Sequence, residues 1–202
     1  MNKHTEMKSG EMTMAVLACG TMGTAILSGV LDCQAAMSRG EVSTDLSATS
    51  QAGETFERVP LPRKYIATVG RDSTAKRLVR TFEEAGHTNV EVFKQNNVEA
   101  VRKSDLVLLC TKPQRVSEFL SEPGMQEALE GKMVVSIAAG TTIAKIKQCV
   151  PSSTKVVRAM PNTPCRIREG MTVISDVTWL THLERDLIAT IFSAVSYTHL
   201  RS

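Results

Sequence analysis

The sequence predicts an α/β fold in which an open, mostly parallel, doubly wound β-sheet is covered by helices on both faces. Short apolar segments of strand length alternate along the chain with segments whose apolar residues recur at helical spacing. The strand-like segments are apolar throughout rather than at every second residue, which is typical of strands buried on both faces of a sheet. Strands that alternate with helices in this way favour a parallel sheet.

The first strand is predicted over residues 14–19, which form a continuous apolar run. A turn with two glycines follows, and a helix then extends to residue 32, because apolar residues from Met22 to Val30 recur at helical spacing. Residues 34–62 show no sustained period, are rich in Ser, Thr, Gly and Glu, and close with two prolines. This composition predicts a flexible insertion between the first helix and the second strand.

The alternation resumes after the insertion. A strand over residues 65–69 precedes a helix over 73–85, whose end is marked by Gly86. The later apolar runs predict strands over residues 90–93, 105–110, 133–137, 155–160 and 171–174. Helical spacing predicts short helices over residues 98–103, 116–120 and 143–149, and a final helix over 180–195. Residues 13–195 are therefore expected to form the folded domain.

Composition narrows the possible partners and the compartment. The chain has 202 residues, of which 42% are apolar and 22% charged, as in an ordinary globular domain. The five cysteines are widely spaced and form no C-x-x-C pair, which argues against a disulfide scaffold or a zinc site and favours a reducing compartment. A net charge of +3 and 4% aromatic residues give no support to a nucleic-acid partner.

Neither a membrane span nor a targeting signal is expected. No apolar run approaches the roughly 20 residues needed to cross a bilayer. Residues 1–12 are polar and lack the apolar core of a secretory signal, so they are expected to form a disordered tail. We therefore expect a cytoplasmic protein. The four histidines lie outside every motif described below, and no metal site is expected.

The turn after the first strand differs by one residue from a dinucleotide-binding fingerprint. Gly20 would let the backbone approach a pyrophosphate, and Gly23 would let the helix pack closely on the strand. The first turn of the helix, with Thr21 and Met22, would offer free N–H groups to the phosphates. Ala18 stands where the first glycine is usual: it is strained if this position needs a positive φ and harmless if only a small side chain is needed. The alternative is an ordinary tight turn.

Residues after the second strand bear on the choice between NAD and NADP. Arg71 and Lys76 could hold a 2′-phosphate, with the Ser73 hydroxyl donating to it. In the competing interpretation Asp72 is the acid that binds the ribose hydroxyl of NAD. Asp72 or Ser73 could also be the N-cap of the following helix. Because the cations outnumber the single acid, NADP is favoured, with NAD possible.

Three further segments follow predicted strands, at the sheet edge where α/β proteins bind ligands. Residues 110–114 combine a lysine with a turn-forming proline, and residues 136–141 are small enough for a nicotinamide to lie close. Residues 158–164 contain two prolines around Asn162 and Thr163, which makes a stiff loop. Each of these segments could equally be a structural turn.

The chain resembles pyrroline-5-carboxylate reductase in the order and spacing of four segments, which are residues 20–23, 112–114, 136–140 and 158–164 with Gly170. The resemblance extends over residues 13–195 and is greatest to fungal members. The resemblance implies a Rossmann-type NADP-binding domain and the reduction of 1-pyrroline-5-carboxylate to L-proline by hydride transfer from NAD(P)H, the last step of proline biosynthesis. A protonated cyclic imine is already electrophilic, so the protein mainly positions the reactants.

The resemblance also assigns residues by position. The implied cofactor-binding residues are Gly20, Thr21, Met22, Gly23, Arg71, Ser73, Asn97, Thr111, Lys112 and Pro113. Those expected to face the nicotinamide and the substrate ring are Ala138, Ala139, Asn162, Thr163 and Pro164. No residue is singled out as a catalytic acid or base.

The sequence departs from the family at its C-terminus. The family continues into an all-helical domain that forms the dimer and completes the substrate pocket, and nothing here corresponds to it. Residues 196–202 match the translation of a transposon end used in sequencing libraries and are expected to be a non-native tail. A truncated chain is expected to turn over poorly and to expose an apolar patch at Leu187, Ile188, Ile191 and Phe192. The full-length protein is expected to form a homo-oligomer through the missing helical domain.

Two alternative functions stay open from the sequence. The chain could belong to another Rossmann reductase of the β-hydroxyacid dehydrogenase type, which requires a catalytic lysine in a distal helical domain. It could also be a non-catalytic NADP-binding module. A substrate assay separates the first alternative from an imine reductase, and tight NADPH binding without reductase activity would favour the second.

Overall fold

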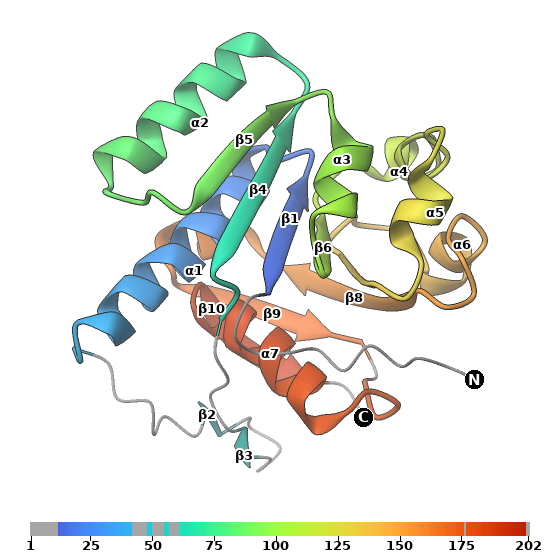
Figure 1. The fold of residues 1–202 in the computed structure, drawn as a ribbon. Coiled ribbons are helices and arrows are strands. Elements are labelled where there is room, and N and C mark those ends of the chain that lie inside the picture. The colour runs from blue at the N-terminus through green and yellow to red at the C-terminus, as the bar shows by residue number, and fades with distance from the viewer. Residues whose placement is uncertain (1–11, 42–47, 50–54, 57–60, 176, 201–202) are drawn as a thin grey trace. The chain divides into compact units, whose positions relative to one another are not determined.

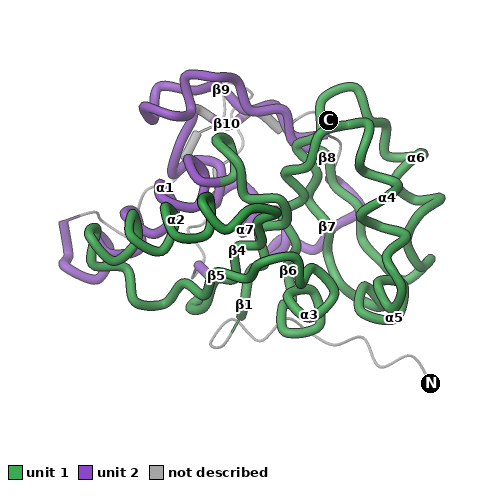
Figure 2. The backbone as a smooth tube through the Cα atoms, turned by 90° about the horizontal axis from the view of Figure 1, so that it is seen from above, with its two compact units in different colours: residues 1–23, 62–158 green, residues 24–61, 159–202 purple. Residues whose placement is uncertain are grey.

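The computed structural model describes residues 12–41, 48–49, 55–56, 61–175 and 177–200. The chain divides into two compact units, one formed by residues 1–23 and 62–158 and the other by residues 24–61 and 159–202 (Figure 2). The two units are described in turn.

The first unit is built on a parallel sheet (Figure 1). Its strands lie in the order β8-β7-β6-β1-β4-β5. Their bounds are Thr13–Leu17 for β1, Lys64–Val69 for β4, Val90–Lys94 for β5, Leu106–Leu109 for β6, Met133–Ser136 for β7 and Lys155–Pro161 for β8. All residues of β1, β6 and β7 are buried, which explains why these strands are apolar throughout and confirms the predicted parallel sheet.

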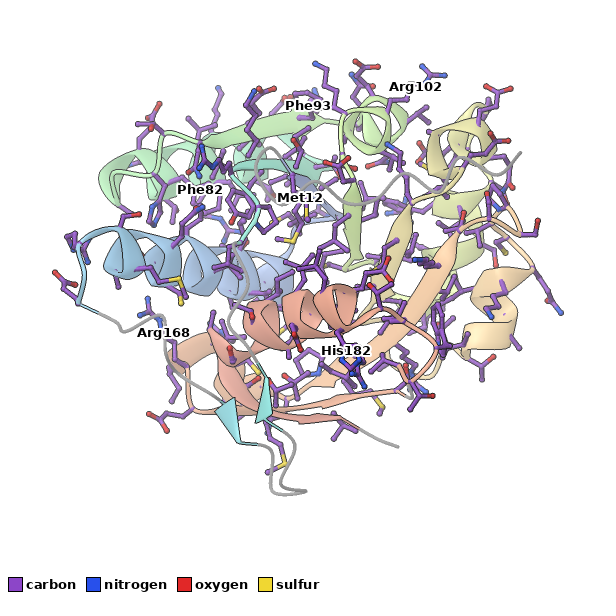
Figure 3. The ribbon with its side chains drawn as sticks, turned by 60° about the horizontal axis from the view of Figure 1, so that its bottom comes forward. Met12, Phe82, Phe93, Arg102, Arg168 and His182 are labelled. Atoms are coloured by element: carbon purple, nitrogen blue, oxygen red, sulfur yellow. The ribbon has the colours of Figure 1, made fainter. Side chains whose placement is uncertain are left out.

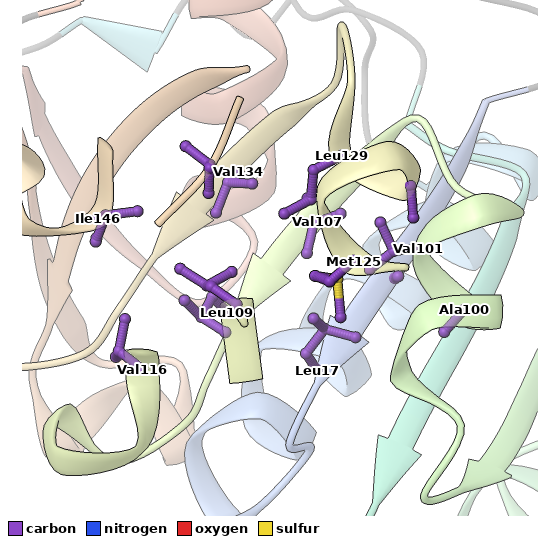
Figure 4. Close-up of a cluster of buried hydrophobic side chains, with 14 of the residues drawn as sticks. Leu17, Ala100, Val101, Val107, Leu109, Val116, Met125, Leu129, Val134 and Ile146 are labelled. Atoms are coloured by element: carbon purple, nitrogen blue, oxygen red, sulfur yellow. The ribbon is translucent and has the colours of Figure 1, made fainter. Parts of the chain in front are cut away.

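Short helices connect these strands. They are α2 (Asp72–Glu84), α3 (Asn97–Arg102), α4 (Val116–Leu120), α5 (Met125–Leu129) and α6 (Ile143–Lys147), with a 3₁₀ turn η1 (Pro113–Arg115) before α4. Figure 4 shows a core in which Leu17, Val107, Leu109 and Val134 from the strands meet Val101, Val116, Met125, Leu129 and Ile146 from the helices. These side chains are fully buried, and truncating one of them to alanine typically costs about 2–5 kcal/mol.

The second unit contains most of α1 (Thr21–Ser38), the 3₁₀ turn η2 (Thr163–Ile167), β9 (Gly170–Ile174), α7 (His182–Ser193) and β10 (Ser196–Leu200). The last residues of β8 pair antiparallel with β9, and β9 pairs parallel with β10. A separate antiparallel pair is formed by β2 (Ala48–Thr49) and β3 (Thr55–Phe56). Helix α7 begins with a capping box, in which Thr181 and Glu184 satisfy each other's backbone N–H groups.

Every strand and helix that the sequence predicts is present, although several bounds differ; α6, for example, ends at Lys147 rather than at residue 149. Helix α1 runs to Ser38 rather than to residue 32, because good helix formers continue until Gly40, whose φ of 70° ends the helix. Residues 34–38 are therefore helical and do not belong to the predicted insertion. Met12, expected in the tail, is buried, whereas residues 1–11 lie outside the described part of the chain.

Other expectations have mixed outcomes. The predicted exposed patch on α7 is wrong, because Leu187, Ile188, Ile191 and Phe192 are at most 2% exposed. Most of the predicted insertion, residues 42–47, 50–54 and 57–60, lies outside the described residues. Residues 196–200 form β10, and their expected non-native origin stays a prediction, while residues 201 and 202 are not described. Among the described helices, none combines the length and the apolar character that a membrane span requires.

Candidate functional site

A pocket of about 440 Å³ opens in the first unit, where the strands β1, β4 and β5 end. Its volume falls in the range of about 300–1,000 Å³ typical of small-molecule sites. The lining residues come from the turn after β1, the end of β4, the start of α2 and the segments around α3 and α4, and they are Ala18, Thr68, Val69, Gly70, Arg71, Gln95, Asn97, Arg115, Phe119 and Glu122. The pocket therefore lies at the carboxyl edge of the parallel sheet, where the sequence predicted a ligand.

The turn after β1 is strained at Ala18, whose φ is 53°. Its backbone N–H donates to Thr68 Oγ1 at 3.1 Å, and the neighbouring Cys19 N–H donates to the Thr68 carbonyl at 2.7 Å. The Gly20 N–H donates back to the Ala18 carbonyl at 2.6 Å. The sequence left open whether this position needs a positive φ, and the structure answers that it does. An alanine there costs about 1–2 kcal/mol relative to ordinary backbone.

Gly23 lets helix α1 start close to the sheet. A Cβ atom on Gly23 would lie 3.1 Å from Cys110 Sγ and 3.2 Å from Val16 Cγ1, so any larger residue would push the helix away. This confirms the packing role predicted for Gly23. Thr21 and Met22 form the first turn of α1 directly after Gly20, and the first turn contains no acidic residue. Helix geometry leaves the first N–H groups without partners inside the helix, so they are available to phosphate oxygens.

Asn97 lies in the pocket wall with a fixed amide orientation. The Thr68 hydroxyl donates to Asn97 Oδ1 at 2.7 Å, and Asn97 Nδ2 donates to Glu122 Oε1 at 2.7 Å. A carboxylate only accepts hydrogen bonds, so Glu122 determines which end of the amide carries the N–H groups. Asn97, predicted near the adenosine ribose, therefore lines the pocket but is only 9% exposed.

The residues at the start of α2 bear on the choice between NADP and NAD. Arg71 is the N-cap, with an extended backbone and no side-chain cap bond, so the N-cap expected at Asp72 or Ser73 is wrong. The Arg71 side chain lines the pocket and has no ion pair or hydrogen bond within the described part of the chain. The Asp72 carboxylate is instead engaged by Lys94, whose Nζ lies 2.8 Å from its oxygens. Ser73 is exposed in the first turn of α2.

The segment after β6 contains residues that the sequence predicted for the cofactor site and pocket residues that it did not predict. Thr111 is buried, Lys112 is the exposed N-cap of η1, and Pro113 is its first residue. Arg115 and Phe119, which the sequence did not single out, line the pocket. Neither carries a motif, and a short helix gives no signal of which side chains reach a pocket. The same holds for Glu122, which follows α4 in a loop.

The predicted nicotinamide-side residues lie in both units. Ala138 is buried and Ala139 exposed in the turn after β7, and neither lines the pocket described above. In the second unit Asn162 holds its own loop: its Oδ1 accepts from the Met171 N–H at 2.9 Å, and its N–H donates to the Met171 carbonyl at 3.1 Å. The two residues that follow, Thr163 and Pro164, are exposed and begin η2.

The second unit has a further ion pair that fixes this region. Arg168, in the left-handed conformation at the end of η2, extends toward α1 and pairs with Asp32 (Figure 3). Gly170 follows at a close approach to Cys165, whose Sγ, N and Cα atoms all lie where a Cβ on Gly170 would be. These contacts tie the loop between β8 and β9 to its surroundings, and its stiffness stays a prediction from the two prolines.

Comparison with known proteins identifies the family. Residues 13–140 match the family described as NADP oxidoreductase, coenzyme F420-dependent. The chain belongs to this family. Within the described residues no group of three His, Cys, Asp or Glu side chains could hold a metal ion.

The names of individual relatives are more specific than the description of the family. The chain is 39% identical over 181 residues to a pyrroline-5-carboxylate reductase of Lophium arboricola, an alignment that covers 85% of this chain and 54% of the relative. The chain thus spans about half the length of the curated relatives it matches. The similarity agrees with the resemblance found in the sequence.

Solved structures confirm the Rossmann-type fold of this chain. A pyrroline-5-carboxylate reductase from Coxiella burnetii superposes with a TM-score of 0.69 at 20% identity, covering 94% of this chain and 58% of that chain. Pyrroline carboxylate reductase from Plasmodium falciparum, solved with NADP bound, has a TM-score of 0.64 at 18% identity, covering 95% of this chain and 58% of that chain. At such identities the likeness concerns the fold alone.

Proposed function

We propose that this chain is the nucleotide-binding part of a pyrroline-5-carboxylate reductase, which reduces 1-pyrroline-5-carboxylate to L-proline. The observation that carries the proposal is the 39% identity to a protein of that name over 181 residues, an alignment that covers 85% of this chain. The pocket at the carboxyl edge of the sheet supports it, because this is where a Rossmann-type fold binds a dinucleotide.

NADPH is the cofactor that the pocket favours. The side chain of Arg71 is unpaired within the described residues and Arg71 lines the pocket, so it is available to a 2′-phosphate. The exposed Ser73 is the second residue of the same helix. Asp72 is already neutralised by Lys94, which weakens the case for a ribose-binding acid and hence for NAD. Gly20, Thr21, Met22 and Gly23 would hold the pyrophosphate against the first turn of α1.

NADPH, when bound, supplies the hydride, and the residues of the chain position the reactants. Thr111, Lys112 and Pro113 would border the cofactor after β6. On the nicotinamide side we assign Ala138 and Ala139, whose small side chains leave room for a ring. Asn162, Thr163 and Pro164 would face the substrate, on a loop whose shape is fixed by the Asn162–Met171 hydrogen bonds. We assign the whole protein to the cytoplasm and expect it to form a homo-oligomer.

Titration of the chain with NADPH and NADH tests the cofactor assignment. Arg71→Ala should weaken NADPH binding about ten- to hundredfold, the value of a hydrogen bond to a charged group, and leave NADH binding nearly unchanged. Arg80→Ala is a matched control, because Arg80 is an exposed arginine of the same helix that pairs with Glu84 away from the pocket. Unchanged NADPH affinity in Arg71→Ala would show that the phosphate assignment is wrong.

Turnover tests the activity itself. The complete protein should oxidise NADPH when 1-pyrroline-5-carboxylate is added, and should not reduce NADP when a β-hydroxyacid is supplied instead. Activity on hydroxyacids alone would overturn the assignment in favour of the alternative reductase.

A further inference from the structure

Two arginines line the same pocket in different electrostatic settings. The side chain of Arg71 has no hydrogen bond or ion pair with the described residues. Arg115 is held along one edge by Glu118, which accepts from Nε at 3.0 Å and from Nη2 at 2.7 Å. A paired guanidinium has lost much of its attraction for a further anion, so the two arginines are unlike as ligand groups.

The Arg115 guanidinium is also held from one face. Its Cζ atom lies 5.0 Å from the centre of the Phe119 ring, and Phe119 is only 7% exposed. The bidentate pair with Glu118 fixes the plane of the group, and the aromatic ring supports it from below. The side chain of Arg115 is nevertheless 54% exposed and lines the pocket. Its exposed part therefore includes a surface of the guanidinium that Phe119 does not cover.

A fixed, planar and weakly hydrated group with an exposed surface suits the face of an aromatic ring more than a phosphate. In an NADP-type dinucleotide the 2′-phosphate and the adenine are carried by the same ribose. A ligand whose phosphate is bound by Arg71 thus brings its adenine into the pocket that Arg71 and Arg115 share.

We propose that Arg115, supported by Phe119 and Glu118, is the platform on which the adenine ring of the dinucleotide stacks, whereas Arg71 reads the 2′-phosphate. This inference rests on the proposed cofactor binding. It divides the pocket into a part that distinguishes NADP from NAD and a part that binds both equally.

Titrations with NADPH, NADH and reduced nicotinamide mononucleotide, which has no adenine, test the division. Arg115→Ala should weaken NADPH and NADH alike, by about five- to thirtyfold, and leave the mononucleotide unaffected. Arg115→Tyr, which restores a plane without a charge, should bind both dinucleotides better than Arg115→Lys, which keeps the charge without a plane. Arg80→Ala again serves as the exposed control.

The outcomes separate this inference from the proposed function. Loss of NADPH affinity alone, rescued by Arg115→Lys, would make Arg115 a phosphate ligand and overturn the stacking role. Unchanged affinity in Arg115→Ala would overturn it as well, and in both cases the cofactor site itself would stand. A wild-type chain that binds neither NADPH nor NADH would overturn the inference together with the proposed cofactor.

Discussion

The Thr68 hydroxyl donates a hydrogen bond of 2.7 Å to Asn97 Oδ1. The Thr68 hydroxyl oxygen also accepts a hydrogen bond from the Ala18 N–H, and Asn97 Nδ2 donates to Glu122 Oε1. One side chain that is 1% exposed thus links the strained turn after β1 to the residue at the start of α3. The geometry of the proposed pyrophosphate turn and of the proposed ribose contact therefore depends on one buried hydroxyl in the pocket wall.

Thr68→Val removes this hydroxyl while keeping the shape of the side chain. The Ala18 N–H and Asn97 Oδ1 would then lose their partner inside the protein, so we expect a loss of about 1–3 kcal/mol in the free energy of unfolding. Urea denaturation measures this loss. Thr81→Val is the matched control, because the Thr81 hydroxyl donates to the Arg77 carbonyl on the exposed side of α2 and should cost less than about 0.5 kcal/mol. Equal losses in the two variants would contradict the linking role of Thr68.

Ala18→Gly should stabilise the protein. At a φ of 53° the alanine Cβ is strained, and its removal outweighs the extra backbone entropy that glycine loses on folding. We expect a gain of about 0.5–1 kcal/mol in urea denaturation. The control is Ala75→Gly at the fourth residue of α2, which should lose up to about 1 kcal/mol instead. A decrease in the free energy of unfolding in both variants would mean that the turn after β1 accommodates Ala18 without strain.

Much of this turn could be predicted from the sequence because its requirements are local. The need for a small residue at Gly23 follows from a helix that starts directly after a buried strand, and the would-be Cβ contacts with Val16 and Cys110 agree with it. The strain at Ala18 was visible as a departure from the glycine pattern. Whether Ala18 adopts a positive φ could not be decided from the sequence, because φ at that position depends on how Thr68 holds the neighbouring backbone.

The remaining pocket residues could not be predicted, since they reach the site through tertiary contacts. Arg115 and Phe119 lie on adjacent short helices whose orientation follows from core packing, which periodicity over three to five residues does not reveal. Glu122 reaches Asn97 across 25 residues of sequence. The end of α1 was missed for a different reason: polar residues obscured the helical period, although the helix formers continued to Ser38.

Cys110 should be unreactive in the folded protein. Burial raises the pKa of the Cys110 thiol, with the neighbouring Cys19 as a smaller cause, so the reactive thiolate is disfavoured. We expect alkylation by iodoacetamide at mildly alkaline pH to leave Cys110 unmodified in the native state, as read by mass spectrometry of peptides. The same chain in urea is the control, where Cys110 should react.

The same shift has a consequence for stability. The folded protein keeps the thiol proton to a higher pH than the unfolded chain does, so this group makes the free energy of unfolding decrease as the pH rises above the ordinary pKa of a thiol. Cys110→Ala should therefore flatten that part of the stability profile. Native labelling of Cys110 as fast as in urea would refute the assignment of a buried neutral thiol.

Gly170→Ala should destabilise the loop that carries Asn162. The new Cβ would lie 2.7 Å from the Cys165 backbone nitrogen and 2.8 Å from its Cα, in addition to its contact with the sulfur. Backbone atoms cannot turn away as a side chain can, so we expect a loss of about 1–3 kcal/mol or more in urea denaturation. Gly70→Ala is the control, because a Cβ at Gly70 would meet no atom within 4 Å.

A second substitution identifies the origin of that loss. Cys165→Ala removes the sulfur but leaves the Cys165 backbone in place, so the double variant Gly170→Ala with Cys165→Ala should recover only part of the stability. Full recovery would show that the sulfur alone excludes a side chain at position 170. The backbone contact would then have no role in fixing the loop, and its rigidity would have to come from the Asn162–Met171 hydrogen bonds and the Arg168–Asp32 pair.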